Sequence, residues 1–148
     1  MNDTQTDYKI LSRLADEQAT RALGQRLAAG LAPGLSVYLS GELGSGKTAL
    51  VRAMFAALGF EGKVKSPTYT IVEPYVIAGR PFYHFDFYRF TDRNDWEDAG
   101  LREYFGGENV CLVEWPEKAS GAIPPADWTV ALRVIDGQAR DAAVIAIS

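Results

Sequence analysis

The spacing of apolar residues changes along this chain, and the changes divide it into predicted helices and strands. Residues 16–32 carry Ala and Leu at the three- and four-residue intervals of an amphipathic helix, with Asp16 as its N-cap. Residues 47–58 show the same kind of spacing and predict a second helix. The apolar run 35–40 between them predicts a strand, and the alternation over 8–12 predicts a strand at the edge of a sheet.

Strand patterns dominate the rest of the chain. Residues 64–76 and 80–90 are rich in aromatic and β-branched residues and predict an antiparallel hairpin around an Ala-Gly turn. Residues 110–115 (VCLVEW) are almost wholly apolar, which is typical of a strand buried on both faces. The remaining predicted elements are a strand pair at 128–134 and 139–147, a short acidic helix at 92–104 and a Pro- and Gly-bearing connection at 116–127.

Helices and strands alternate in the first part of the chain, whereas strands follow one another in the second part. We therefore expect an α/β fold with a P-loop NTPase-like mixed β-sheet, flanked by helices and carrying antiparallel hairpins. The length of 148 residues and the 47% hydrophobic composition fit a single domain over residues 1–148.

Composition and charge exclude several classes of protein. The formal net charge of −4 argues against a dedicated nucleic-acid binder, which needs a basic face. The one cysteine, Cys111, excludes a disulfide framework and favours a reducing compartment. The first residues lack the basic and apolar segments of a signal peptide, and no apolar run is long enough to cross a membrane. We expect a cytoplasmic protein without a membrane partner.

The segment GELGSGKT, residues 41–48, matches the pattern G-x-x-x-x-G-K-[ST] and lies between the predicted strand 35–40 and the predicted helix 47–58. Glycines in such a loop let successive backbone N–H groups face one concavity, and the start of the helix adds unpaired N–H groups and a positive dipole. Lys47 would add a charge near the β and γ phosphates, and the Thr48 hydroxyl would bind the magnesium ion that bridges them. The segment therefore predicts a nucleoside triphosphate site.

Two acidic residues follow apolar strands and are the candidates to complete this site. Asp86 comes after Phe82-Tyr83-His84-Phe85, and Glu114 comes after the apolar residues 110–113. Ligands of open α/β sheets bind at the carboxyl ends of the strands, where both carboxylates are expected. One of them would hold the metal, and the other would orient the attacking water or the water shell of the metal; their spacing in the sequence does not assign the two roles.

Other polar residues leave alternatives open. The segment 66–70 (SPTYT) is either a switch that senses the γ-phosphate or an ordinary Ser-Pro turn that leads into the hairpin. His84, the only histidine, is interpreted as a packed or hydrogen-bonded strand residue rather than a metal ligand. Arg89 pairs either with phosphate or with an acid such as Asp92, and Trp115 either packs in the core or lines the nucleotide pocket.

Four blocks of the sequence together resemble the TsaE family, also called YjeE. They are GELGSGKT, KSPTYTIVEPY at 65–75, YHFDFYRF at 83–90 and CLVEWPEK at 111–118, and they cover about the first four fifths of the chain in order. Members of this family are small bacterial ATPases needed for the threonylcarbamoyl modification of adenosine 37 in tRNAs. The resemblance implies two partner proteins, TsaB and TsaD, of which TsaD carries the transfer. The tRNA would be touched mainly through these partners.

The resemblance also implies roles for particular residues. Thr48 and Glu114 would hold Mg2+, Asp86 would be the second acid needed for hydrolysis, and residues 66–70 would behave as a switch. Glu17 lies in a stretch that resembles the family's segment near the adenine, and Arg140 would reach the base or ribose from the other side. The residues implied in ATP binding are therefore Glu17, Gly41, Leu43, Gly44, Ser45, Gly46, Lys47, Thr48 and Arg140.

The leading hypothesis is an ATPase whose hydrolysis depends on its partners, with Lys47, Asp86 and Glu114 as catalytic residues. The runner-up is a small-molecule or nucleoside kinase, although the Arg-rich lid of such enzymes is not apparent in the sequence. A GTPase is disfavoured because no N-K-x-D string is present. The non-enzymatic alternative is a binding module in which ATP only orders residues 66–70 for docking.

Overall fold

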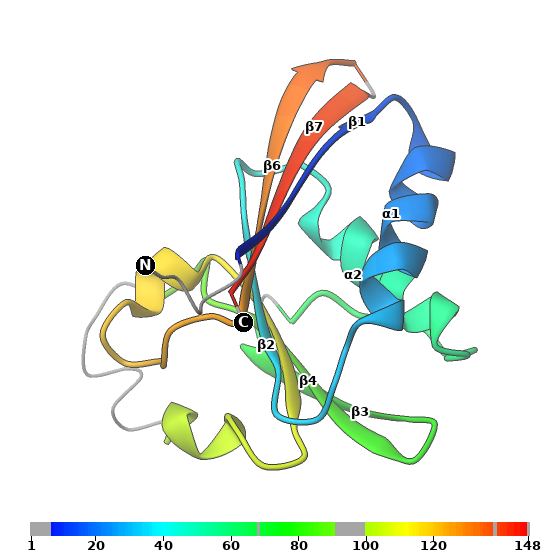
Figure 1. Cartoon of the computed structure of the whole chain (residues 1–148). Helices are drawn as coiled ribbons and strands as arrows, with labels where there is room; N and C mark the ends of the chain where they lie inside the picture. The colour runs from blue at the N-terminus through cyan, green and yellow to red at the C-terminus, as the bar shows by residue number, and fades with distance from the viewer. Residues whose placement is uncertain (1–6, 68, 91–99, 138, 148) are drawn as a thin grey trace, which may run out of the picture.

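A seven-stranded sheet runs through the computed structural model, which describes residues 7–67, 69–90, 100–137 and 139–147 (Figure 1). The strand order is β1-β7-β6-β2-β5-β4-β3. The elements are β1 (Asp7–Leu14), α1 (Glu17–Ala29), β2 (Ser36–Ser40), α2 (Lys47–Ala57), β3 (Val72–Ile77), β4 (Arg80–Asp86), η1 (Leu101–Tyr104), β5 (Val110–Glu114), η2 (Pro116–Ala119), β6 (Trp128–Asp136) and β7 (Ala139–Ile147).

The centre of the sheet is parallel and its outer strands are antiparallel. Strands β6, β2, β5 and β4 run in the same direction, and the hairpin partners β7 and β3 run against β6 and β4. Strand β1 pairs antiparallel with β7 and forms one edge. The predicted mixed sheet with antiparallel hairpins is thus confirmed. The carboxyl ends of the four parallel strands lie on one side of the sheet, where β2 leads into the segment 41–48.

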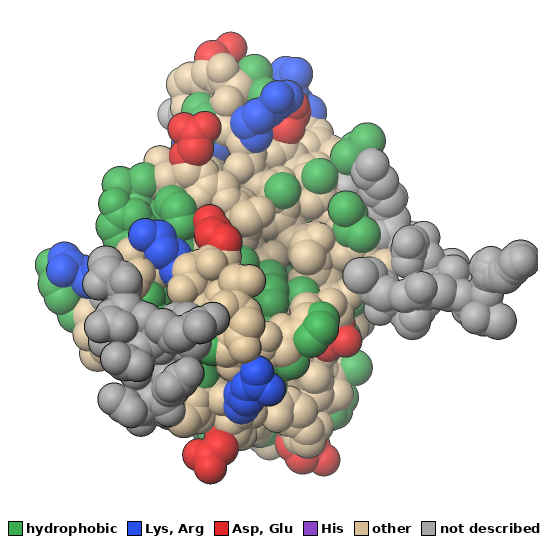
Figure 2. Space-filling view, turned by 90° about the vertical axis from the view of Figure 1, so that its left-hand side faces the viewer, with side chains coloured by type: hydrophobic (Ala, Val, Ile, Leu, Met, Phe, Trp, Pro, Cys, Tyr) green, Lys and Arg blue, Asp and Glu red, His purple; other side chains and the backbone are tan. Residues whose placement is uncertain are grey.

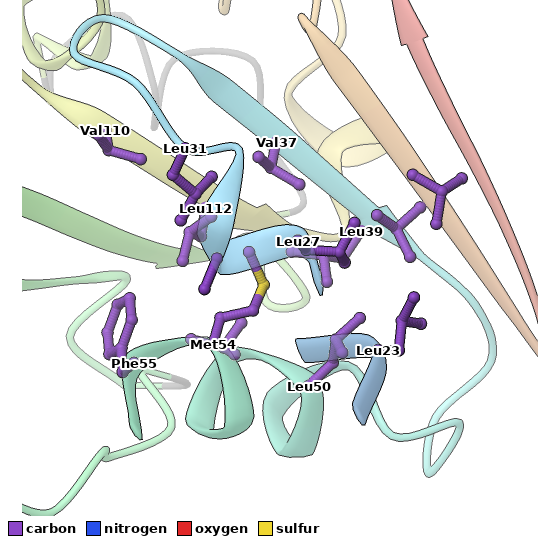
Figure 3. Packing of buried hydrophobic residues seen from close by; sticks show 14 of the residues in the cluster. Leu23, Leu27, Leu31, Val37, Leu39, Leu50, Met54, Phe55, Val110 and Leu112 are labelled. Carbon is purple, nitrogen blue, oxygen red and sulfur yellow. The ribbon is translucent and has the colours of Figure 1, made fainter. Parts of the chain in front are cut away.

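Helices α1 and α2 cover one face of the sheet, on the right in Figure 1. Asp16 caps α1 as predicted, because its carboxylate accepts the Ala19 N–H at 2.9 Å. The two helices approach closely at Gly24, where a Cβ would lie 2.5 Å from the Cβ of Ala53. Their apolar sides and the sheet enclose the larger core, in which Leu50, Met54 and Phe55 of α2 pack with residues of α1, β2 and β5 (Figure 3).

The opposite face is covered over only part of the sheet. A second apolar cluster, built on Phe85, Phe87, Cys111 and Val113, lies there beneath the segments that contain η1 and η2. Figure 2 shows the face away from α1 and α2, where backbone and other side chains, in tan, separate the apolar side chains, in green. Strand β5 is therefore buried on both faces, as the apolar run 110–115 predicted.

Several predicted boundaries were wrong. The strand predicted from residue 64 begins only at Val72, because a turn at residues 69–70 precedes it. The Ile71 N–H donates to the Pro67 carbonyl at 2.7 Å, and Ile71 has a φ of 72°. The next strand ends at Asp86, four residues early, and a turn from Phe87 to Phe90 follows. Of the acidic helix predicted at 92–104, residues 101–104 form a 3-10 turn, and residues 92–99 lie outside the described residues.

No helix among the described residues is long and apolar enough to cross a membrane.

Candidate nucleotide site

The segment 41–46 connects β2 to α2 and curls around the start of the helix. Gly46 is the N-cap of α2 and has a φ of 102°, a conformation that favours glycine because a Cβ would be strained there. At Gly41 the reason for glycine is space, since a Cβ would lie 2.5 Å from the Leu132 carbonyl oxygen of β6. The loop therefore packs closely against β6 at Gly41, is exposed at residues 42–44 and is buried again at Ser45.

Lys47 is buried within this loop, with 5% of its surface exposed. Its ammonium donates to the carbonyl of Gly41 at 2.5 Å and to that of Glu42 at 3.1 Å, and it lies 4.3 Å from the centre of the Trp115 ring. Burial lowers the pKa of Lys47, and the carboxylates of Glu114 and Asp86 act against that shift. The fold thus places the Lys47 ammonium in the loop, with Glu114 and Asp86 close enough to affect its pKa.

Glu114, the last residue of β5, receives contacts from two other elements through a single oxygen. The Thr48 hydroxyl of α2 donates to Glu114 Oε2 at 2.8 Å, and His84 Nε2 of β4 lies 2.7 Å from the same oxygen. Glu114 and His84 are buried, with 3% and 0% of their surfaces exposed. The structure therefore brings together the predicted metal-binding pair, Thr48 and Glu114, from segments that are distant in the sequence.

Asp86 lies beside Glu114, because the two residues are register partners at the ends of β4 and β5. Its Oδ1 accepts the Tyr88 N–H at 2.9 Å. Burial raises the pKa of Asp86, and the hydrogen bond from Tyr88 opposes this less strongly. A carboxyl group with a raised pKa next to a second carboxylate is suited to accept a proton during a reaction.

These groups share a cleft of about 340 Å³. Ser66, at the start of the predicted switch, lines it, whereas Thr68 of that segment lies outside the described residues. Trp115, which has a φ of 57°, lines the cleft and also packs against the second apolar cluster, so both of its predicted positions apply. The lining residues are Leu43, Gly44, Ser45, Gly46, Lys47, Thr48, Ala49, Ser66, Asp86, Tyr88, Glu114 and Trp115.

Three predicted nucleotide contacts, Glu17, Gly41 and Arg140, lie apart from the cleft lining. Arg140 of β7 donates from Nε to the Ser45 carbonyl at 3.0 Å and from Nη2 to the Gly44 carbonyl at 3.2 Å. Its guanidinium therefore stabilises the backbone of the loop through two hydrogen bonds. Glu17 is exposed at the start of α1. Direct contacts of Glu17, Gly41 and Arg140 with a nucleotide remain predictions.

The residues left open by the sequence now have defined surroundings. His84 is buried and paired with Glu114, as its interpretation as a hydrogen-bonded strand residue requires. Arg89 packs over the Tyr69 ring at 4.4 Å, and Asp92, its predicted acidic partner, lies outside the described residues. Tyr88 was not predicted in the site, although its position two residues after Asp86 was a signal for it.

The donor set of this cleft fits magnesium bound together with a phosphate. Mg2+ prefers oxygen ligands and in nucleotide sites takes only one or two groups from the protein, with phosphate oxygens and water as the others. The hydroxyl of Thr48 and the carboxylate of Glu114 supply such oxygens, and they already lie 2.8 Å apart. Backbone N–H groups at the start of α2 face the same region and suit an anion.

A strand, a glycine-containing loop and a helix that face two strand-end acids define the class of P-loop proteins within the α/β folds. The family model of threonylcarbamoyl adenosine biosynthesis protein TsaE matches residues 14–142. The chain therefore belongs to the TsaE family, as its four sequence blocks suggested.

Individual relatives agree with this assignment. The chain is 49% identical over 112 residues to tRNA threonylcarbamoyladenosine biosynthesis protein TsaE of Haemophilus influenzae, covering 76% of this chain and 70% of that protein. It is 35% identical over 128 residues to the protein of the same name from Treponema pallidum, covering 86% and 92%. The crystal structure of Bacillus subtilis YdiB is similar with a TM-score of 0.79 and 27% identity, covering 97% of this chain and 88% of that one.

Proposed function

We propose that this chain is a magnesium-dependent ATPase that drives turnover of the complex that makes threonylcarbamoyladenosine in bacterial tRNA. The observation that carries the proposal is the convergence of Lys47, Thr48, Asp86 and Glu114 on one cleft. The names of its relatives support the biological setting, since they are proteins of tRNA threonylcarbamoyladenosine biosynthesis.

The residues of the cleft divide the work between binding and hydrolysis. The ammonium of Lys47 and the backbone N–H groups at the start of α2 bind the phosphates of ATP. Thr48 and Glu114 hold Mg2+, which when bound neutralises charge on the phosphates. Asp86 orients the attacking water and accepts its proton, a role that the pKa of Asp86, raised by burial, favours. Trp115 closes one side of the cleft beside Lys47.

The partners and the location follow from the same assignment. TsaD and TsaB are the expected partner proteins, and tRNA is met only through their complex in the cytoplasm. The net charge of −4 supports indirect contact with tRNA, because direct binding would need a basic face. Weak hydrolysis by the chain alone and faster hydrolysis with its partners are expected.

The test is phosphate release from ATP by the purified chain, alone and with TsaB and TsaD, with and without Mg2+. We expect release that requires Mg2+, increases with the partners and is lost in Lys47→Ala and Glu114→Ala. The same two variants should fail to support tRNA modification in a reconstituted system. The proposal is wrong if both variants leave modification intact.

Parallel measurements separate the alternative functions. Transfer of phosphate from ATP to a nucleoside or sugar would indicate a kinase instead. Preference for GTP in a nucleotide competition would indicate a GTPase. Repeated rounds of tRNA modification by a variant that binds ATP without hydrolysing it would indicate a binding module.

A further inference from the structure

His84 is a buried histidine that the proposed roles of the cleft residues do not yet include. It lies on β4 two residues before Asp86, so both side chains are on the same face of the strand. None of its surface is exposed, and its neighbours in sequence on β4, Tyr83 and Phe85, are aromatic. An apolar side chain would fit this buried position, so the presence of a polar imidazole there needs a physical explanation.

The contacts of His84 supply that reason. Its Nε2 lies 2.7 Å from Glu114 Oε2, the oxygen that also accepts the Thr48 hydroxyl at 2.8 Å. A carboxylate oxygen only accepts, so the imidazole must donate from Nε2. Among the residues that the structure describes, its other nitrogen, Nδ1, has no hydrogen-bond partner. Burying an unpaired nitrogen is unfavourable. The favourable contact of Nε2 with Glu114 offsets this cost.

We propose that His84 is a positioning residue, which holds Glu114 Oε2 so that the carboxylate keeps one orientation toward Thr48 and the metal. A hydrogen bond from each of two elements fixes the carboxylate more tightly than one, because rotation about its last bond would then break both. The proposal rests on the proposed function, since it assigns His84 to the magnesium site of the ATPase. It predicts that His84 matters for hydrolysis and metal use more than for ATP binding.

The first test compares three substitutions at this position. His84→Leu removes the donor and keeps an apolar side chain of similar size in the core. His84→Gln keeps an amide N–H at the reach of Nε2, whereas His84→Asn places its amide at the reach of Nδ1. We expect His84→Leu and His84→Asn to lower magnesium-dependent hydrolysis about 10- to 100-fold, and His84→Gln to recover most of that loss.

The measurements include readouts that a purely structural role would not change in this pattern. The Mg2+ concentration for half-maximal hydrolysis should rise in His84→Leu and His84→Asn and return toward wild type in His84→Gln. ATP affinity, measured by titration calorimetry, should stay within a few-fold of wild type in all three. Equal activity of His84→Gln and His84→Asn, or full activity of His84→Leu, would overturn the proposal.

A second measurement does not depend on any variant folding or on activity. Because His84 is the only histidine of the sequence, a tag-free chain labelled with nitrogen-15 in histidine shows a single imidazole by NMR. In the protein without nucleotide, the shifts of its two nitrogens should show hydrogen on Nε2 and none on Nδ1. A neutral ring with hydrogen on Nδ1 would contradict the hydrogen bond to Glu114 and the proposal with it.

The two proposals fail in different ways. If the wild-type chain hydrolyses no ATP alone or with its partners, the ATPase function is wrong, while the NMR spectrum still tests the pairing of His84 with Glu114. If the wild-type chain hydrolyses ATP and His84→Leu does so equally well, the function stands and the positioning role is wrong.

Discussion

The cleft has two walls that are built in opposite ways. The loop wall, residues 41–48, is one continuous segment that presents backbone N–H groups and the cation of Lys47. The strand wall consists of Asp86 and Glu114, which come from the ends of β4 and β5, and His84 contacts the Glu114 carboxylate. The loop wall is partly open to solvent, whereas the strand wall is buried among apolar strands.

This difference separates two tasks within one site. Backbone N–H groups and a lysine attract phosphates of any nucleotide state, so the loop wall would provide binding in the proposed ATPase. Buried carboxylates act on charge and protons that change during a reaction, so the strand wall would provide hydrolysis in the proposed ATPase. Variants of the loop wall should therefore lose nucleotide affinity, and variants of the strand wall should lose hydrolysis while keeping affinity.

The largest effect is expected from Lys47→Met in the loop wall. Methionine fits the same buried space but removes the charge, so ATP affinity should fall about 100-fold or more, as expected when charged hydrogen bonds are lost. Hydrolysis should become undetectable at ordinary ATP concentrations. Calorimetry and phosphate release measure the two effects, and Lys63→Met, at an exposed lysine, is the control. Unchanged affinity in Lys47→Met would contradict the role of the loop wall.

Glu114→Gln should break the strand wall while sparing the loop wall. The amide keeps the shape and one oxygen that can accept the hydrogen bonds from Thr48 and His84, but it lacks the negative charge that would hold Mg2+, so hydrolysis should fall roughly 100- to 1,000-fold. ATP affinity should stay within a few-fold of wild type. Single-turnover hydrolysis and equilibrium binding distinguish the two quantities, and the exposed Glu117→Gln serves as the matched control. A parallel loss of binding would show that the walls are not separable.

Asp86 gives a prediction about stability and pH. Burial raises the pKa of Asp86 above that of an unfolded aspartate, so its ionised form costs stability once the pH exceeds the unfolded pKa of about 4. Asp86→Asn should therefore raise the Tm of the metal-free protein at pH 7 by roughly 2–4 °C, the shift for about 1 kcal/mol, while abolishing most hydrolysis.

The increase in Tm caused by Asp86→Asn should become smaller as the pH is lowered toward about 4, because the aspartate is then protonated in the unfolded chain as well. The difference in Tm between the variant and the wild type is measured by thermal unfolding, monitored by circular dichroism at several pH values in the presence of a chelator. Asp136→Asn, at an exposed residue on the β6 turn, is the control and should show no comparable gain. A Tm that falls at pH 7 in Asp86→Asn would contradict the cost of burying its charge.

The smallest effect is expected from Arg140→Lys, which weakens the support of the loop wall. Lysine keeps the charge but lacks the planar fork that contacts the Gly44 and Ser45 carbonyls, so ATP affinity should fall about 5- to 10-fold. Arg133→Lys on the neighbouring strand changes only an exposed ion pair and should alter affinity less than about twofold. Equal effects of the two substitutions would show that Arg140 does not support the loop.

The sequence-based predictions were accurate for elements that depend on local patterns and less accurate for contacts between distant segments. Helix α2 and strand β2 were predicted almost to the residue, because each depends on a local apolar pattern. The strand predicted from residue 64 was wrong because Pro67 and the positive φ of Ile71 hold a turn that no apolar period reveals. The contacts of Arg140 with the loop were missed, since they depend on how β7 pairs within the sheet.

The sequence by itself determined the loop wall, since a glycine-containing segment between a strand and a helix needs only short-range geometry to form a phosphate site. It also named Asp86 and Glu114 as candidates. Only the tertiary structure decided that they are neighbours, that Thr48 and His84 meet on the same oxygen of Glu114, and that Arg140 holds the loop. These contacts depend on strand order and register, which are set by the packing of residues far apart in the chain.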